Sequence, residues 1–333
     1  MTAASAVPAV APVGVAPRDA VGVADRLRTD VTARVRALVE GGAAAGAADD
    51  LPDIYVGCTA ALAVARCPAQ YRADGEDGWG FPGWSAPLAA AAVGRAALAR
   101  HLALDDVALP APLEVVRSWM RDAAKAPTTA VAEWIAQLVR SGDRTTVAAT
   151  AATATRWVAG FLRLHSWPLP DRLGIVADDA DGARTRRWQK AWRPLGRGTP
   201  VRVASSPDAV AGKVTASGQF DLVLHRPSSP LDEVLAERAA FEAAAGALTA
   251  GIVAAGVVVT SGDTGERVRF PVDDRRLTRG ADLVAGVVHH RLVATQPTPD
   301  PFADATPGPA CRHCPHRDDC TGGQAWLARS LAH

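Results

Sequence analysis

Three cysteines within ten residues near the end of the chain constrain its fold more than any other feature. Cys311, Cys314 and Cys320 form a C-x2-C-x5-C pattern. The x2 spacing brings two sulfurs to one metal ion or cluster, and the x5 loop returns a third. Such a site requires a fourth ligand, and the position of that ligand determines which parts of the chain must meet.

The fourth ligand has both distant and local candidates. Cys67 ends a short expected helix and precedes Pro68, and Cys58 is the other distant thiol. Locally, His313 and His316 interleave with the cysteines, so a Cys3His zinc site would need no distant ligand. Five cysteines, an odd number, in a long chain without an export signal argue against a disulfide framework. The pattern therefore predicts a metal site and leaves its metal open.

Composition excludes several classes of protein. The chain has 333 residues, of which 48% are hydrophobic, enough for one large or two ordinary domains and too many for a wholly disordered chain. With 36 basic and 35 acidic residues it has no global field for nucleic acid or anionic lipid, so such binding requires a local patch. No apolar run reaches the roughly 18 residues of a membrane span. We expect a cytoplasmic protein that does not bind membranes and, without a P-loop or dinucleotide motif, no nucleotide cofactor.

Hydrophobic periodicity divides the chain into four regions. Residues 1–17, rich in Ala, Val and Pro, form an expected disordered tail, and residues 18–58 form an N-terminal helix and linker. Residues 59–295 form the folded core, and residues 296–333 a proline-rich linker followed by the cysteine cluster.

The order of the predicted elements gives an α/β fold. Helical spacing recurs over 18–40, 59–66, 86–104, 113–124, 128–139 and 145–164. Short β-branched runs then predict strands at 201–204, 212–216, 219–224, 256–260 and 267–272, with helices at 231–254, 275–292 and 323–331. We therefore expect a helix-rich N-terminal half and a small mixed sheet flanked by helices.

The distant cysteine and the C-terminal triplet together resemble a known family. A C-terminal C-x2-C-x5-C with a lone Cys-Pro far upstream, here Arg66-Cys67-Pro68-Ala69-Gln70-Tyr71, is similar to the iron–sulfur branch of the PD-(D/E)XK nuclease superfamily. That branch includes the AddAB-type nuclease, the CRISPR-adaptation exonucleases and actinobacterial RecB-like proteins, and the resemblance spans residues 59–320. It implies a PD-(D/E)XK nuclease-like fold and a [4Fe-4S] cluster, leaves Cys58 unliganded, and assigns four ligands: Cys67, Cys311, Cys314 and Cys320.

Such a cluster would act as a clasp between the two ends of the chain. A loop of 244 residues separates Cys67 from Cys311, and closing it costs about 5 kcal/mol of chain entropy. Ligation comparable to that of a structural zinc, about 10 to 16 kcal/mol, exceeds this cost.

The nuclease motifs implied by the resemblance are incomplete. These enzymes hold divalent metals with an Asp and a D/E-x-K pair on neighbouring strands. Asp221 fits the first motif, G-x-x-D-x-V, in residues 218–223, whereas no D/E-x-K triplet exists and Leu98 replaces the histidine of a G-x-x-x-H motif. A Q-x-x-x-Y motif is also missing from 237–248. We expect a pseudo-nuclease without catalytic residues, in which Asp221 is a vestige or makes a local structural pair.

An arginine-rich segment is the candidate for contacting nucleic acid. Basic residues interleaved with tryptophans can contact phosphates and stack on bases, and the alternative is a solvated loop anchored by its tryptophans. The candidates are Arg184, Arg186, Arg187, Lys190 and Arg193.

The sequence therefore predicts a [4Fe-4S]-bearing, nuclease-like protein that binds DNA or joins a protein complex that processes DNA, without cleaving it. One alternative is an active metal-dependent DNA exonuclease with rearranged ligands. The other is a redox- or metal-responsive interaction scaffold, with zinc as its alternative metal.

Overall fold

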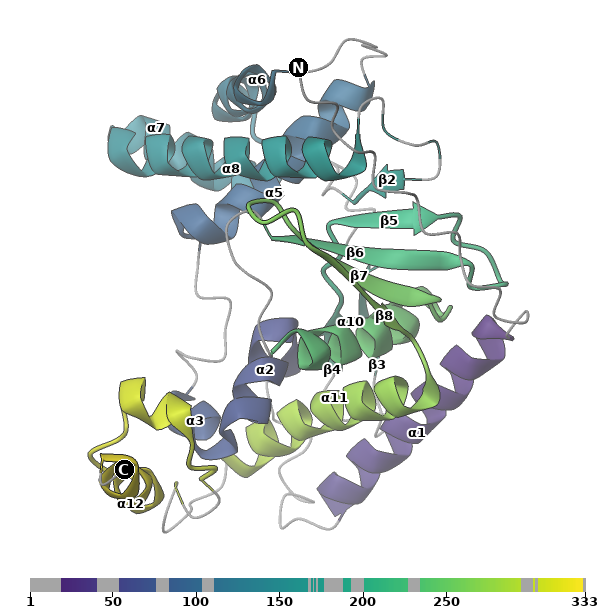
Figure 1. Ribbon diagram of the computed structural model, residues 1–333, viewed down its shortest axis with the longest axis vertical. Coiled ribbons are helices and arrows are strands. Elements are labelled where there is room, and N and C mark those ends of the chain that lie inside the picture. Colours follow the sequence, from purple (N-terminus) through teal and green to yellow (C-terminus); the bar gives the residue numbers. More distant parts are fainter. Residues whose placement is uncertain are drawn as a thin grey trace.

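A mixed sheet covered by helices on both faces forms the centre of the molecule (Figure 1). The computed structural model describes residues 19–40, 54–75, 84–103, 111–166, 169, 171, 173–176, 188–192, 201–226, 234–294, 302 and 305–331. The predicted α/β class and helix-rich N-terminal half are confirmed. The expected disordered tail, 1–17, lies outside the described residues.

The larger sheet has the order β2-β5-β6-β7-β8. Its strands are β2 (Leu173–Ile175), β5 (Ala209–Gly212), β6 (Phe220–Arg226), β7 (Gly256–Ser261) and β8 (Arg267–Pro271). The β6 and β7 strands are parallel and joined through α10 (Leu235–Ala250), and the other neighbours are antiparallel. The sheet is therefore mixed, as expected.

The prediction of a strand at 212–216 is wrong, because the strand is β5, which ends at Gly212. Gly212 has φ +104° and Gly218 has φ +64°, a backbone region that suits glycine, so the chain turns between them. A smaller sheet, β1-β4-β3, contains β1 (Ile54–Val56), β3 (Gln189–Trp192) and the predicted β4 (Val201–Ala204).

The two faces of the larger sheet bury two separate cores. Side chains alternate along a strand, so Leu222 and Leu224 of β6 face one layer and Val223 faces the other. The first layer contains α10 with α1 (Ala20–Glu40), α2 (Cys58–Arg66) and α11 (Asp274–Ala294). The second contains α5 (Ala86–Ala103), α6 (Pro112–Lys125), α7 (Ala130–Ser141) and α8 (Arg144–His165). These helices confirm the predicted helical ranges to within a few residues.

The C-terminal segment meets the α2–α3 region away from the larger sheet (Figure 1). It contains the 3₁₀ turn η2 (Pro309–His313) and α12 (Thr321–Leu331), and α3 (Pro68–Ala73) follows α2. No helix in the described part of the chain is long and apolar enough to cross a membrane.

Candidate functional site

Four of the five cysteines line one cavity. Cys67 lies at this cavity together with Cys311, Cys314 and Cys320, although the chain between them includes every strand of the larger sheet. Cys58 does not line it. The structure therefore brings together the four residues that the resemblance assigns as ligands and leaves the fifth thiol elsewhere.

Local backbone structure places the distant cysteine. Cys67 is the extended residue between α2 and α3, with φ −161° and ψ +104°. Pro68 occupies the first position of α3. A backbone N–H at this position has no hydrogen-bond partner within the helix, so proline, which lacks an N–H, is well tolerated there. The Cys-Pro pair therefore ends one helix and begins the next, and it holds Cys67 at the junction.

Backbone donors approach two of the sulfurs. The N–H of Gly308 donates to Sγ of Cys311 at 3.4 Å, and the N–H of Gly323 donates to Sγ of Cys320 at 3.3 Å. Burial raises the pKa of the Cys314 thiol, and the nearby sulfurs of Cys67, Cys311 and Cys320 raise this pKa further. The other three sulfurs are thus close enough to Cys314 to act on it electrostatically. N–H donors of this kind stabilise and tune a metal-bound thiolate.

Thiolates are ligands of both iron–sulfur clusters and zinc ions, so the four thiols are compatible with either. Zinc holds its sulfurs about 2.3 Å from one point. Across the described ranges, no group of three or more His, Cys, Asp or Glu side chains is arranged to hold one metal ion. His316, one of the two candidate histidine ligands of the zinc alternative, has its Nε2 2.9 Å from Oδ1 of Asp74. Four thiols around one cavity, with no described Asp, Glu or His lining it, fit an iron–sulfur cluster and a zinc ion alike.

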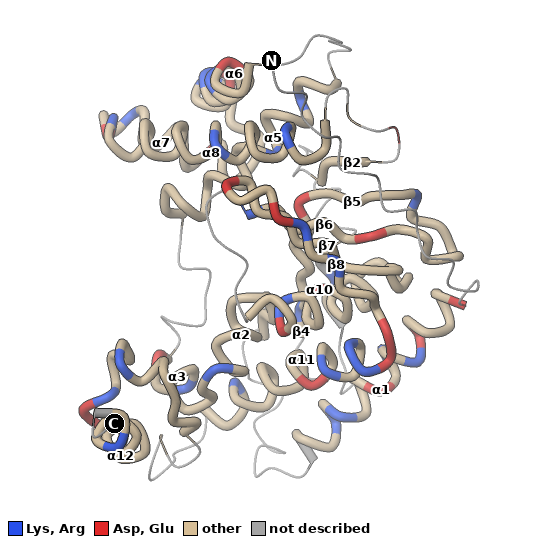
Figure 2. The backbone as a smooth tube through the Cα atoms, in the orientation of Figure 1, with Lys and Arg blue, Asp and Glu red and all other residues tan. Residues whose placement is uncertain are grey.

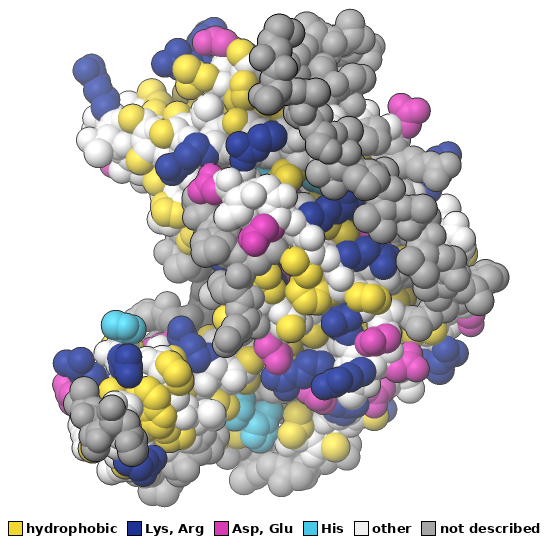
Figure 3. All heavy atoms as spheres, viewed as in Figure 1, with side chains coloured by type: hydrophobic (Ala, Val, Ile, Leu, Met, Phe, Trp, Pro, Cys, Tyr) yellow, Lys and Arg dark blue, Asp and Glu magenta, His cyan; other side chains and the backbone are white. Residues whose placement is uncertain are grey.

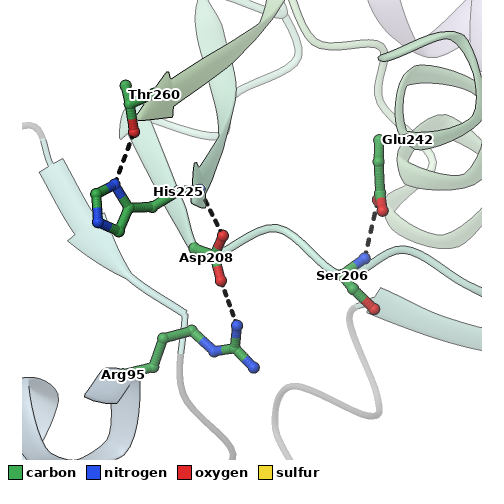
Figure 4. Close-up of polar contacts among 6 residues, drawn as sticks. All are labelled: Arg95, Ser206, Asp208, His225, Glu242 and Thr260. Atoms are coloured by element: carbon green, nitrogen blue, oxygen red, sulfur yellow. Dashed lines mark hydrogen bonds and ion pairs between the residues drawn. The ribbon is translucent and has the colours of Figure 1, made fainter. Parts of the chain in front are cut away.

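A second polar group lies buried between the larger sheet and α5 (Figure 4). Asp208, directly before β5, is 5% exposed, and Arg95 of α5, which pairs with it, is 8% exposed. The other Asp208 oxygen accepts the backbone N–H of His225 at 2.6 Å. Nδ1 of His225 lies 2.9 Å from Oγ1 of Thr260 on β7. Both Asp208 oxygens are therefore occupied by groups of the protein itself.

Sequence reasoning missed Asp208 and Arg95. The signal in the sequence was Arg95, which stands among alanines and other apolar residues of a helix. An arginine in such a position is expected to be buried, and a buried arginine predicts a carboxylate partner. Gly94, the first residue of the incomplete G-x-x-x-H motif, has a packing role. A Cβ at Gly94 would lie 2.7 Å from the Trp157 ring of α8, so glycine allows the two helices to approach.

Asp221 forms a local structural pair, one of its two predicted roles. Its carboxylate accepts two hydrogen bonds from the Arg269 guanidinium, at 2.9 and 2.8 Å. The pair lies over Gly256 of the intervening strand, where a Cβ would come within 2.7 Å of Oδ1 of Asp221. This hydrogen bonding raises the pKa of Arg269. Asp221 thus links β6 to β8 across β7.

Cys58 belongs to a third polar group, centred on Glu242 of α10. Oε2 of Glu242 accepts bonds from Oγ–H of Ser205 at 2.7 Å and from N–H of Ser206 at 2.9 Å. Burial raises the pKa of Glu242. Burial, and then the charge of Glu242, raise the pKa of the Cys58 thiol to about 12. Cys58 therefore lies in the buried surroundings of Glu242 and not at the cavity of the other four cysteines.

Two histidines, His165 of α8 and His225 of β6, lie where α8 packs against the larger sheet. The Phe161 ring centroid is 4.4 Å from that of His165 and 5.6 Å from that of His225. Within the described part of the chain, Nε2 of His165 has no hydrogen-bond partner, whereas the backbone of Trp157 interacts with the His225 ring. Burial lowers the pKa of both rings to about 4, with Arg267 adding to the effect on His165 and Asp208 opposing it for His225.

These rings predict a loss of stability in mild acid. Both are neutral in the folded protein, whereas in the unfolded chain they take up protons below a pKa of about 6.5. The stability they contribute is therefore present above pH 6.5 and is lost as the pH falls towards 4, by at most roughly 3 kcal/mol for each ring. This loss of stability is measured by comparing the urea midpoints of the native protein and of a His165→Gln/His225→Gln variant from pH 7 to 4.5. Parallel pH profiles would contradict this expectation.

Most residues of the predicted nucleic-acid segment lie outside the described part of the chain. These are Arg184, Arg186, Arg187 and Arg193. Lys190 is exposed on β3, and the neighbouring Trp188 is 4% exposed in the core, as the alternative of an anchoring tryptophan predicts. Elsewhere the two signs of charge mix: Figures 2 and 3 show basic and acidic residues interspersed over α1 and α11, where Arg34 pairs with Asp282.

Comparison of the chain with protein-family models gives no match, and comparison with curated proteins gives none either. The geometry of these sites and the resemblance in the sequence are therefore what indicate the function.

Proposed function

We propose that the protein carries a [4Fe-4S] cluster on a nuclease-like fold and acts in DNA binding, or within a DNA-processing complex, without cleaving DNA itself. The observation that carries this proposal is the position of Cys67 at the cavity of Cys311, Cys314 and Cys320. These four residues would hold the cluster. When bound, the cluster would supply a cross-link between the α2–α3 junction and the C-terminal segment, together with a one-electron redox centre.

The state of the two acidic residues supports the absence of cleavage. A nuclease of the resembled family needs free carboxylates on neighbouring strands to hold a divalent metal. The candidates are Asp208, directly before β5, and Asp221 on β6, and each is already paired with an arginine. An arginine cannot replace the missing lysine as a base, because the guanidinium stays protonated.

The β6 strand gives a second argument of the same kind. It carries Asp221 of the first motif, and between it and α10, where the resemblance expects the strand that ends in D/E-x-K, the described residues contain no strand. On the face that Asp221 shares, its later residues are Val223 and His225, both buried. Neither can take the part of a metal-binding carboxylate or of a lysine.

DNA as the partner follows from the resemblance and from the arginine- and tryptophan-rich segment 184–193. Cations that contact phosphates release counterions, so binding through this segment weakens steeply as salt rises. Tryptophans of the segment would add base stacking to this binding. Trp188, however, is buried in the core.

Incubation with labelled single- and double-stranded DNA, plus magnesium or manganese, tests this function. We expect retention of DNA without cleavage, and weaker retention at higher salt and in an Arg186→Ala/Arg187→Ala variant. Cleavage that is lost in Asp221→Ala or Asp208→Asn would establish the exonuclease alternative instead. Binding to neither form of DNA would overturn the proposed partner and favour the scaffold.

A further inference from the structure

Gly323, in the first turn of α12, borders the cysteine cavity. A Cβ built on it would lie 3.5 Å from Sγ of Cys320 and 3.7 Å from Sγ of Cys311, both ordinary van der Waals distances. The N–H of Gly323 donates to Sγ of Cys320. Gly323 thus donates a backbone hydrogen bond to one cavity cysteine, and a side chain on it would lie against the sulfurs of two.

The helix itself gives no reason for glycine at this position. Gly323 is helical and is not among the residues with positive φ, so any L-residue can adopt its backbone conformation. Glycine is the poorest helix former apart from proline, because its backbone loses the most entropy on folding. An alanine would favour α12, and the cavity as it stands accommodates the added methyl group without a clash.

Gly322 and Gly308 provide the contrast. A Cβ at Gly322 would meet Cγ of Pro307 at 3.3 Å and Cβ of Ala305 at 3.9 Å, and no sulfur lies within its reach. A Cβ at Gly308 would meet nothing within 4 Å. Among these three glycines of the C-terminal segment, a side chain would enter the space between sulfurs at Gly323 alone.

We propose that Gly323 is a positioning residue for the inorganic cluster: its missing side chain leaves the cluster its room beside Cys311 and Cys320, and its N–H holds the Cys320 sulfur. This inference rests on the proposed [4Fe-4S] function. It explains why the first turn of α12 carries glycine at a position where the helix would be more stable without it. Outer residues of a metal site typically change metal affinity 10- to 100-fold.

Gly323→Ala and Gly323→Val, with Gly322→Ala and Gly308→Ala as matched controls, test the proposal. After anaerobic purification we would measure iron and sulfide per chain, the cluster absorbance during exposure to EDTA, and the thermal midpoint of the iron-free proteins. We expect about tenfold faster loss of iron in Gly323→Ala and a larger loss in Gly323→Val. The iron-free Gly323→Ala protein should unfold at or above the native midpoint.

The outcomes separate the two claims. A native protein without iron refutes the proposed function. A native protein that holds iron, with Gly323 variants that retain it as well as the Gly322 and Gly308 variants do, refutes the role of Gly323 alone. An iron-free Gly323→Ala protein that unfolds well below the native midpoint also refutes it, because the residue would then serve the fold and not the cluster.

Discussion

Replacing Cys67 with serine is expected to release the iron and to destabilise the protein by about 5 kcal/mol or more. The serine leaves the other three cysteines without a distant ligand, so the cross-link between the α2–α3 junction and the C-terminal segment is lost. Its loss restores the conformational entropy of a loop of 244 residues to the unfolded chain. Iron content and urea unfolding under anaerobic conditions measure the two effects.

Cys58→Ala is the matched control. Cys58 is nine residues from Cys67 on the same helical segment, yet its buried thiol interacts with Glu242 and does not line the cavity. The control should keep full iron content. Equal iron in the native protein and in Cys67→Ser would contradict the assignment of Cys67.

Replacing Arg95 with methionine is expected to destabilise the protein by about 3 to 5 kcal/mol, because it leaves the Asp208 carboxylate buried without its counter-charge. Arg95 and Asp208 hold α5 to the start of β5, and neither can reach water without unpacking the helices from the sheet. Urea unfolding at pH 7 measures the change.

Arg100→Met is the control on the same helix. Arg100 pairs with Asp122 at the surface, where both side chains are more than 40% exposed, so its loss should cost at most about 1 kcal/mol. The double variant Arg95→Met/Asp208→Asn should recover part of the stability, since it removes the unpaired charge. Similar losses for Arg95→Met and Arg100→Met would show that the buried pair has no special role.

Local patterns in the sequence predict the described helices other than α3, and three of the five strands of the larger sheet, β6, β7 and β8. The 3.6-residue spacing of apolar side chains is a property of each helix alone, so α5 to α8 and α11 could be located directly. The β5 strand was misplaced because residues 212–216 include β-branched residues, whereas pairing with β6 selects 209–212. The β1 and β3 strands have three and four residues, too few to show a period.

The sites, like the fold, could be predicted from the sequence only where they depend on a local pattern. The C-x2-C-x5-C spacing is local and visible in the sequence, whereas the meeting of Cys67 with those cysteines was implied only by the resemblance. The pairs Asp208–Arg95 and Asp221–Arg269 join residues 113 and 48 positions apart, and no local pattern predicts which arginine meets which carboxylate. The structure therefore adds the partners that distinguish a paired acid from a free one.

The central claim is that four cysteines hold one iron–sulfur cluster between the α2–α3 junction and the C-terminal segment. Analysis of metal and acid-labile sulfide in the anaerobically purified full chain tests it most directly. We predict a brown protein with about four iron and four sulfide per chain. A colourless protein with stoichiometric zinc and no sulfide would contradict it.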